Sequence, residues 1–575
     1  MSLPRRRTVL KILAGVAIAW LAAVAVVLIL ARHSAEQGLE RVRAVRKGAT
    51  VEQVLDAHTG SELRRAAGDL KAAQSWSGNP VLAPLRWLPV VGRQVDSGRH
   101  LNHAARRSVE ISVETLDQLR SVADRPAPRG EGRVRLLDQV NRLVKRAEGS
   151  LRAVDPGSGQ GLIGPLDHAH RTFLSERSAA LDGLVRADDL TTALSHLLKG
   201  PSRYLLVGAN NAEMRAGSGM WLSATTLDTD RGSLTLGPVR PTDDLVVPRG
   251  KVPVTDADLA RNWSFLDPGH DFRQMALTPR FSVSAEQAAR LWAAQPGNTP
   301  VSGVLVVDID GVRALLRVVG PVTVGGVKYE AANLRQRLLR DQYATYNGAQ
   351  QARKDALGDV ARATFDRLER GGWKASKLVG ELSLAVQGRH LLVWSADPVE
   401  QRGWRAVSVD GRLQRSSLAV SLLNRGGNKL DAYVDQTVKV RTDTKGPDTA
   451  VTVQVELHNR APAGLPAYVA GGPQAGAGLQ PGEYGGILVV NVPGGAGAVT
   501  MTGGQYLAVA GGDGLTQARG VYLTIPAGAA IRVTIGFVLA GRHGSLVLEP
   551  SGRVPEAAWT FGRRFKAELR RTIHW

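Results

Sequence analysis

The first 31 residues contain an uncharged apolar run that limits where the rest of the chain can fold. The run extends from Ile12 to Ala31, and these 20 residues would measure about 30 Å as a helix, the thickness of the hydrocarbon core of a bilayer. The apolar region of a cleaved signal peptide is normally about 7–15 residues long, so we expect a transmembrane helix rather than a signal peptide. Four basic residues among the first eleven favour a cytoplasmic N-terminus, although the other flank, residues 32–47, is also basic. The sequence predicts a cytoplasmic tail (1–11), a single span (12–31) and an extracytoplasmic remainder.

The charge of the chain bears on its partners. The sequence contains 73 Lys and Arg residues against 52 Asp and Glu residues, which gives a net charge of +21. Outside a membrane this charge suits anionic lipid headgroups, lipid-linked pyrophosphates and anionic wall polymers, and nucleic acid is not expected as a partner. A solvated arginine-rich surface accounts for the same charge without any ligand. The chain has no cysteine, which excludes disulfides, thiolate metal sites and cysteine nucleophiles.

The length of 575 residues predicts several domains, and the residue pattern changes twice along the chain. Residues 32–200 have apolar positions at helical spacing, with breaks such as Ser77–Gly92, and predict helical hairpins or a stalk next to the membrane. Residues 201–396 interleave apparent strands and helices, which is typical of an α/β core. Residues 397–560 contain short alternating strands between Gly-rich turns and predict a sandwich-like β domain.

The last segment, residues 561–575, is basic with interleaved apolar residues. Two interpretations are open, an amphipathic helix lying on an anionic surface and a solvated terminal tail. Taken together, the patterns predict an α+β multidomain protein. Its expected parts are a transmembrane helix, a helical membrane-proximal region, an α/β core, a C-terminal all-β domain and a basic tail.

Common catalytic signatures are absent from the sequence. There is no nucleophile elbow, no Walker loop, no H-E-x-x-H and no intact dinucleotide fingerprint. The polar segment Asn210–Thr226 nevertheless lies between two expected strands and contains Arg215 and several Gly residues. A guanidinium group beside exposed backbone amides suits a phosphate or a carboxylate. The alternative is a purely structural ion pair between Glu213 and Arg215.

A second polar segment, Gly237–Leu245, follows the expected hairpin and contains Arg240, Asp243 and Asp244. Carboxylate oxygens are suitable ligands for a divalent metal, and a guanidinium group is suitable for phosphate. The segment therefore predicts a site for a pyrophosphate with a metal ion. Aspartates that cap a turn are the alternative interpretation.

Three stretches carry a resemblance to a known family. They are LLVGANNAEMRAGSGM (205–220), VSGVLVVDIDGVRALLRVVGPVTV (301–324) and LLVWSADPVEQ (391–401). These stretches resemble a family of membrane-anchored actinobacterial proteins known only as a domain of unknown function. This resemblance covers most of the chain and implies no activity.

The order of motifs also resembles, more distantly, the LytR-CpsA-Psr family, which transfers glycopolymers from polyprenyl-pyrophosphate carriers to peptidoglycan. A strand ending at Gly208 precedes Arg215, and a hairpin closes on Arg240. Gly320–Val324 is similar to that family's Gly-Gly-Val-x-Val, and Tyr346–Leu357 is similar to its arginine-rich helix. The resemblance implies an α/β core of that type. It also implies the following site: Arg215, Arg240 and Arg353 on the pyrophosphate, with Asp243 or Asp244 on Mg²⁺.

The sequence departs from the LytR-CpsA-Psr pattern at the first arginine. That family has Arg-Ser-Asp, whereas this chain has Arg-Ala-Gly-Ser-Gly from Arg215 to Gly219. The departure puts metal binding and turnover in question. We therefore hold two hypotheses: a phosphotransferase-like cell-envelope protein that acts on or binds lipid-linked pyrophosphate or an anionic glycopolymer, and a non-catalytic envelope scaffold or wall-polymer binding protein.

Overall fold

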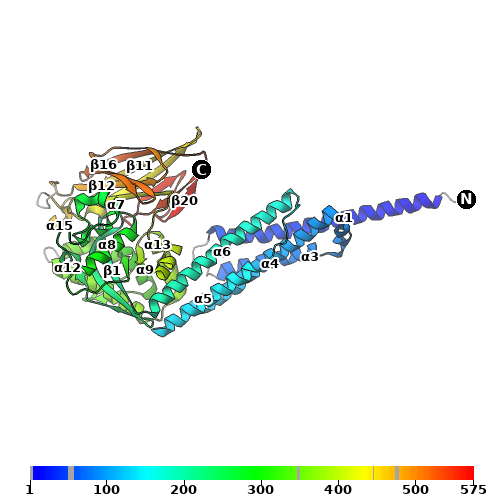
Figure 1. Cartoon of the computed structure of the whole chain (residues 1–575), viewed down its shortest axis with the longest axis horizontal. Coiled ribbons are helices and arrows are strands. Elements are labelled where there is room, and N and C mark those ends of the chain that lie inside the picture. The colour runs from blue at the N-terminus through cyan, green and yellow to red at the C-terminus, as the bar shows by residue number, and fades with distance from the viewer. Residues whose placement is uncertain (1–3, 49–56, 346–349, 445, 473–477) are drawn as a thin grey trace. The chain divides into compact units, whose positions relative to one another are not determined.

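The computed structural model describes residues 4–48, 57–345, 350–444, 446–472 and 478–575 (Figure 1). The expected mixture of helix and sheet is confirmed. The chain divides into two compact units. The first consists of residues 1–125 and 136–191, and the second of residues 126–135 and 192–575.

The first unit is helical. Its elements are α1 (Pro4–Gly48), α3 (Ala57–Ser77), the 3-10 helix η1 (Pro80–Trp87), α4 (Pro89–Ala123) and most of α5 (Glu131–Arg152) and α6 (Gly164–Lys199). Small residues let α1 and α3 approach closely: a Cβ atom at Gly38 would lie 2.9 Å from Cγ of Leu70. The chain reverses at η1, where the Asn79 side chain accepts a hydrogen bond from the backbone N–H of Val81 at 3.0 Å.

One helix among the described residues is long and apolar enough to cross a membrane. It is the segment Ala19–Arg43 of α1, close to the N-terminus. The apolar run predicted as a span lies in this same continuous helix. A signal sequence near an N-terminus also passes this test of length and composition.

The second unit begins with a mixed sheet. Its strand order is β3-β2-β1-β5-β8, with β4 paired to β2. The strands are β1 (Ser202–Met214), β2 (Gly219–Asp230), β3 (Ser233–Leu236), β4 (Arg240–Pro241), β5 (Gly303–Val307) and β8 (Leu391–Ser395). Strand β5 pairs parallel to β1 and antiparallel to β8. Apolar side chains including Trp221, Phe272 and Phe281 form the core of this sheet.

Helices and short strands connect these strands. They are η2 (Thr242–Asp244), α7 (Ala257–Trp263), η3 (Ser264–Leu266), η4 (Phe272–Leu277), α8 (Phe281–Ala293), α9 (Ile309–Val319), β6 (Val322–Val324), β7 (Val327–Tyr329), α10 (Leu334–Gln336), η5 (Arg337–Asp341), α11 (Gln342–Thr345), α12 (Gln350–Glu369), α13 (Ala375–Gln387) and α14 (Pro398–Ala406). The apolar stretch 303–324 forms β5, α9 and β6 in that order, a strand, a helix and a strand. Strand β6, however, pairs with β7 in a separate two-stranded sheet.

Two six-stranded sheets follow and share one apolar core. Their orders are β13-β16-β11-β10-β18-β19 and β14-β15-β12-β9-β17-β20. The strands are β9 (Ser417–Asn424), β10 (Val434–Asp443), β11 (Thr449–Asn459), β12 (Tyr484–Pro493), β13 (Gly497–Thr502), β14 (Tyr506–Asp513), β15 (Thr516–Ile525), β16 (Ala530–Leu539), β17 (Ser545–Glu549), β18 (Ala558–Phe561), β19 (Arg563–Arg564) and β20 (Arg571–His574), with η6 (Leu430–Tyr433) and α15 (Ala467–Ala470) between them. In β11, alternate residues from Val451 to Leu457 are buried, because successive side chains of a strand point to opposite faces.

The basic C-terminal segment differs from both expectations for residues 561–575. It forms β19 and β20, and β20 pairs antiparallel with β17. Ile573 is buried between exposed neighbours, and Nε1 of Trp575 donates a hydrogen bond to Oγ1 of Thr449 at 3.0 Å. The alternation that suggested an amphipathic tail is therefore that of an edge strand in the second sheet.

Strand β1 connects the first sheet to the paired sheets. It is 13 residues long, and its last six residues are all buried. The backbone N–H of Met214, at the end of β1, donates to Oδ2 of Asp431 at 3.0 Å. This contact fixes the turn that follows β1 against the segment that follows β9.

Candidate functional site

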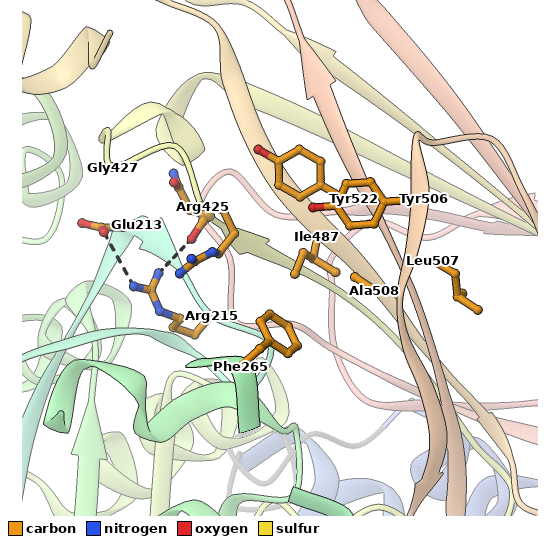
Figure 2. A pocket seen from close by; sticks show the side chains of 11 residues that line it. Glu213, Arg215, Phe265, Arg425, Gly427, Ile487, Tyr506, Leu507, Ala508 and Tyr522 are labelled. Atoms are coloured by element: carbon orange, nitrogen blue, oxygen red, sulfur yellow. Dashed lines mark hydrogen bonds and ion pairs between the residues drawn. The ribbon is translucent and has the colours of Figure 1, made fainter. Parts of the chain in front are cut away.

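A pocket of about 630 Å³ lies where the end of β1 meets the paired sheets (Figure 2). Segments distant in the sequence form its wall, from the β1–β2 hairpin, η3, the segment after β9, and strands β12, β14 and β15. The residues that line it are Glu213, Arg215, Phe265, Asn424, Arg425, Gly427, Ile487, Tyr506, Leu507, Ala508 and Tyr522. The pocket has a charged end and an aromatic, apolar side.

Arg215 lies in the tight turn between β1 and β2, and only 3% of it is exposed. Its backbone N–H donates to the Ser218 carbonyl at 2.8 Å, which closes the turn. Its Nη1 donates to the carbonyls of Met214 at 3.0 Å and Asn424 at 3.2 Å, and its Nη2 lies 3.8 Å from Oε1 of Glu213. Burial and then the nearby Arg425 lower the pKa of Arg215 to about 10, so the guanidinium is charged at neutral pH.

Two glycines allow this turn. A Cβ atom at Gly219 would lie 2.6 Å from the backbone of Asn210, and a Cβ atom at Gly217 would lie 2.5 Å from the Thr278 carbonyl oxygen. The turn is also held from outside, because Gly217 N–H donates to the Ala276 carbonyl at 2.8 Å. The Gly-rich sequence after Arg215 therefore serves close backbone packing that positions the arginine.

Arg425 supplies the second positive charge of the pocket. It follows β9 directly and is exposed. Figure 2 shows its guanidinium beside that of Arg215, and its charge contributes to the lowered pKa of Arg215. Within the described part of the chain, no hydrogen bond or ion pair engages the Arg425 guanidinium. Two adjacent arginines repel each other, and an anion between them would remove that repulsion.

Glu213 does not neutralise this pair completely. Its Oε2 contacts Nζ of Lys429, a stronger contact than its approach to Arg215. Burial lowers the pKa of Lys429 to about 8. The structural interpretation of a Glu213–Arg215 ion pair therefore describes only part of this arrangement. Glu213 is shared between two cations, Arg215 and Lys429.

A buried polar group behind the pocket holds these segments together. Asp431 accepts hydrogen bonds from Nδ2 of Asn424 at 2.8 Å, from the hydroxyl of Tyr484 at 3.0 Å and from the backbone of Met214. Burial raises the pKa of Asp431. Because Asp431 is fully buried and hydrogen-bonded on both oxygens, it has a positioning role for the strand ends and does not face the pocket.

The other side of the pocket is aromatic and apolar. The rings of Tyr506 and Tyr522 stack with their centroids 5.1 Å apart and their planes 9° apart. Tyr506 is 58% exposed, and its neighbour Leu507 is 57% exposed. Phe265 of η3, 56% exposed, faces the same space. Exposed apolar groups beside two arginines suit a ligand that combines an anionic group with a sugar or hydrocarbon body.

The structure does not gather the other sequence-predicted site residues around Arg215. Arg240 pairs with Ala224 in β2. The Arg215 turn leads into Gly219, the first residue of β2, so it lies five residues and on the order of 15 Å from Ala224 along this strand. Nη1 of Arg240 donates to Oδ1 of Asn298 at 3.3 Å. Arg353 lies in α12, and its side chain is outside the described part.

Asp243 and Asp244 form η2, directly after β4, and both are exposed. The hydrogen bonds that Arg273 donates to Asp271 raise the pKa of Arg273, and the nearby carboxylate of Asp243 raises it further to a smaller extent. Across the described ranges, no group of three or more His, Asp and Glu side chains has an arrangement that could hold a metal ion. The Mg²⁺ site at Asp243 or Asp244 stays a prediction.

Sequence reasoning missed Arg425, Lys429 and the two tyrosines. These residues come from segments about 200 residues or more after Arg215, so no local pattern links them to it. One signal was available: NRGGNK (Asn424–Lys429) is a polar, Gly-containing run directly after the buried strand SLAVSLL. It has the same character as NNAEMRAGSG (Asn210–Gly219), where Arg215 was found.

Residues 199–343 match the model of a family described as "Protein of unknown function (DUF4012)". The match includes Glu213, Arg215 and Phe265 of the pocket and ends before Arg425 and the tyrosines. No curated protein and no solved structure is significantly similar to the chain. The match supports a domain of unknown function over residues 199–343, a smaller part of the chain than the resemblance implied, and this domain contributes one side of the pocket.

Proposed function

We propose that this chain is a membrane-anchored, extracytoplasmic protein of the cell envelope that binds an anionic ligand in the Arg215–Arg425 pocket. The ligand class is a lipid-linked pyrophosphate or an anionic glycopolymer. The observation that carries the proposal is the pair of adjacent arginines, one buried and one exposed, with the exposed guanidinium free to meet an anion. The apolar run of α1 and the basic N-terminal tail support the location.

Binding accounts for the pocket better than group transfer does. Among the described residues that line it, Glu213 alone has a carboxylate, which Lys429 and Arg215 hold, and none is a histidine. The two guanidinium groups match phosphate or carboxylate oxygens, to which arginine donates in pairs. The stacked tyrosines offer a flat surface for a sugar ring or a prenyl chain. The phosphotransferase hypothesis, with its distant LytR-CpsA-Psr resemblance, is the second candidate.

The test uses the full chain in lipid nanodiscs and measures binding by isothermal titration calorimetry. The probes are inorganic pyrophosphate, farnesyl pyrophosphate and polygalacturonate. The variant Arg425→Ala should weaken binding of the anion by roughly 10- to 100-fold, because a hydrogen bond between charged groups is worth about 1.5–3 kcal/mol. The matched control is Arg441→Ala, since Arg441 is an exposed arginine on β10 that does not line the pocket.

The tyrosines separate recognition of the anion from recognition of the attached body. Tyr506→Ala should weaken binding of farnesyl pyrophosphate or polygalacturonate and leave inorganic pyrophosphate unchanged. Equal affinities for Arg425→Ala, Arg441→Ala and the parent chain with all three probes would refute the proposal. Release of inorganic phosphate from farnesyl pyrophosphate with added Mg²⁺, lost in Arg425→Ala, would instead support the transferase candidate.

A further inference from the structure

The 3-10 helix η1 packs against the apolar part of helix α1. Nε1 of Trp20 donates a hydrogen bond to the Val81 carbonyl in η1 at 3.0 Å. Val24 and Val27 of α1 are buried against Leu82 and Leu85 of η1. Figure 1 shows α3 and α4, the helices on either side of η1, alongside α1. The turn between α3 and α4 is thus fixed to the middle of the apolar run.

The length of the run decides what this contact means. If the part of α1 that contacts η1, from Trp20 onward, lay outside the bilayer, only Ile12–Ala19 of the apolar run would remain to cross it. These eight residues measure about 12 Å as a helix, less than half of the roughly 30 Å hydrocarbon core. A membrane-spanning α1 therefore needs Trp20–Ala31 in the bilayer, and η1 then lies at bilayer depth.

The surface of the turn fits this location. Trp87 is 88% exposed, Leu88 49%, Val90 58% and Val91 39%. On α1 itself, Leu21, Val26 and Ile29 are exposed by 55%, 55% and 66%. Exposed apolar side chains on two segments that pack together, with a tryptophan among them, are typical of contact with the interface of a bilayer.

The backbone of the turn also tolerates a low-dielectric environment. Pro80, Pro84 and Pro89 have no N–H group, so three donors that lipid could not satisfy are absent. The N–H groups of Leu82 and Leu88 donate to the carbonyls of Asn79 and Leu85 at 3.0 and 3.1 Å. The one charged side chain, Arg86, pairs with Asp96 on α4 at 2.9 Å, and its long stem can extend toward the headgroups.

We propose that residues 80–91 insert into the lipid bilayer beside α1, in the leaflet where α1 emerges, as a second membrane contact of this chain. The occupant of the apolar surface is lipid, and a second copy of the chain is the competing occupant. The inference rests on the membrane anchor of the proposed function. The insertion would fix the rotation and depth of α1 and hold the start of α4 at the membrane surface.

The test exploits the absence of cysteine in this chain. A single cysteine replaces Val90 in the full chain, is labelled with the environment-sensitive fluorophore NBD, and the protein is reconstituted into phosphatidylcholine–phosphatidylglycerol vesicles. The matched control is Ser112→Cys, an exposed position on the same helix, 22 residues and about 33 Å away along α4. Trp87→Cys repeats the measurement in case the first variant does not fold, with folding checked by circular dichroism.

We expect a blue-shifted NBD emission at position 90, quenched by nitroxide-labelled lipids and protected from aqueous iodide. The label at position 112 should emit as in water and be quenched by iodide. Water-like emission at 87 and 90 in protein that stays with the vesicles overturns the insertion and leaves the anchor intact. Protein that does not float with the vesicles overturns the anchor itself. A blue shift that depends on protein concentration, without lipid quenching, assigns the surface to a second copy.

Discussion

Arg215 and Glu213 approach to 3.8 Å at the end of β1, yet Glu213 makes its closer contact with Lys429. The pocket therefore contains one carboxylate that is shared by two buried cations, with Arg425 as a third cation nearby. Backbone carbonyls also hold the Arg215 guanidinium, at 3.0 and 3.2 Å. This excess of positive charge is what an incoming anion would balance.

The arginine of the turn should matter more for binding than for folding. We expect Arg215→Met to lose pyrophosphate binding and to lower the free energy of unfolding by about 1–3 kcal/mol, because the carbonyls of Met214 and Asn424 lose this donor while Glu213 keeps Lys429 as its partner. The contrasting variant is Arg553→Met. Arg553 is 1% exposed, and its charge stabilises buried Asp431, so its loss should cost about 3–5 kcal/mol. Urea titrations would measure both, and equal destabilisation of the two variants would contradict the distinction.

Binding of the anion should weaken as the pH rises through about 8. Burial lowers the pKa of Lys429 to about 8, so above that pH Lys429 is neutral and Glu213 keeps its negative charge in the pocket without this partner. Dissociation constants for pyrophosphate at pH 6.5, 7.5, 8.5 and 9.5 would measure the effect. Lys429→Arg keeps its charge at this position throughout and should lose less affinity than the parent chain between pH 7.5 and 8.5. Parallel profiles for the parent chain and the variant would show that Lys429 does not control the charge of the pocket.

A buried imidazole directly before β8 should make stability fall at alkaline pH. Burial opposes the charged form of His390, but Asp308, whose Oδ2 lies 2.7 Å from Nδ1, and Asp310 outweigh it and raise the pKa of His390 to about 9. Because the folded state holds this proton more tightly, the stabilisation is fully present below about pH 6.5 and is lost as the pH rises through about 9. At 1.36 kcal/mol per pH unit, it is on the order of 3 kcal/mol.

The His390 effect is measured by urea unfolding at pH 6 and pH 9.5. His390→Gln should be less stable at pH 6 and should lose most of the difference between the two pH values. A His390→Gln variant whose stability changes between the two pH values by as much as that of the parent chain would contradict a charged His390.

The glycine that begins β2 should be needed for the turn. Gly219→Ala places a Cβ atom 2.6 Å from the backbone of Asn210, which must shift, so we expect a loss of about 1–3 kcal/mol and weaker anion binding. Gly495→Ala is the control, because a Cβ atom there meets nothing within 4 Å. Thermal unfolding of both variants would show the difference. If Gly219→Ala were as stable as the control, the β1–β2 turn would adjust freely.

Much of the local structure could be predicted from the sequence. Strand β1 and the β2–β3 hairpin follow from alternation around Asp230–Gly232, and the order β5, α9, β6 follows from the pattern of residues 303–324. These features depend on residues close together in the chain. The basic C-terminal segment was harder, because whether Arg571–His574 becomes a strand depends on β17, which pairs with it.

The sequence by itself determined the apolar N-terminal run, the succession of helical, mixed and β regions, and one residue that lines the candidate pocket, Arg215. Only the tertiary structure decided that Arg215 meets Arg425 and two stacked tyrosines, and that Arg240 lies elsewhere. The physical reason is that the pocket lies where the end of one strand meets two packed sheets, so its residues are neighbours across some 200 to 300 residues of chain. Spacing along the sequence predicts which face of an element a residue occupies, but the packing of elements decides what that face meets.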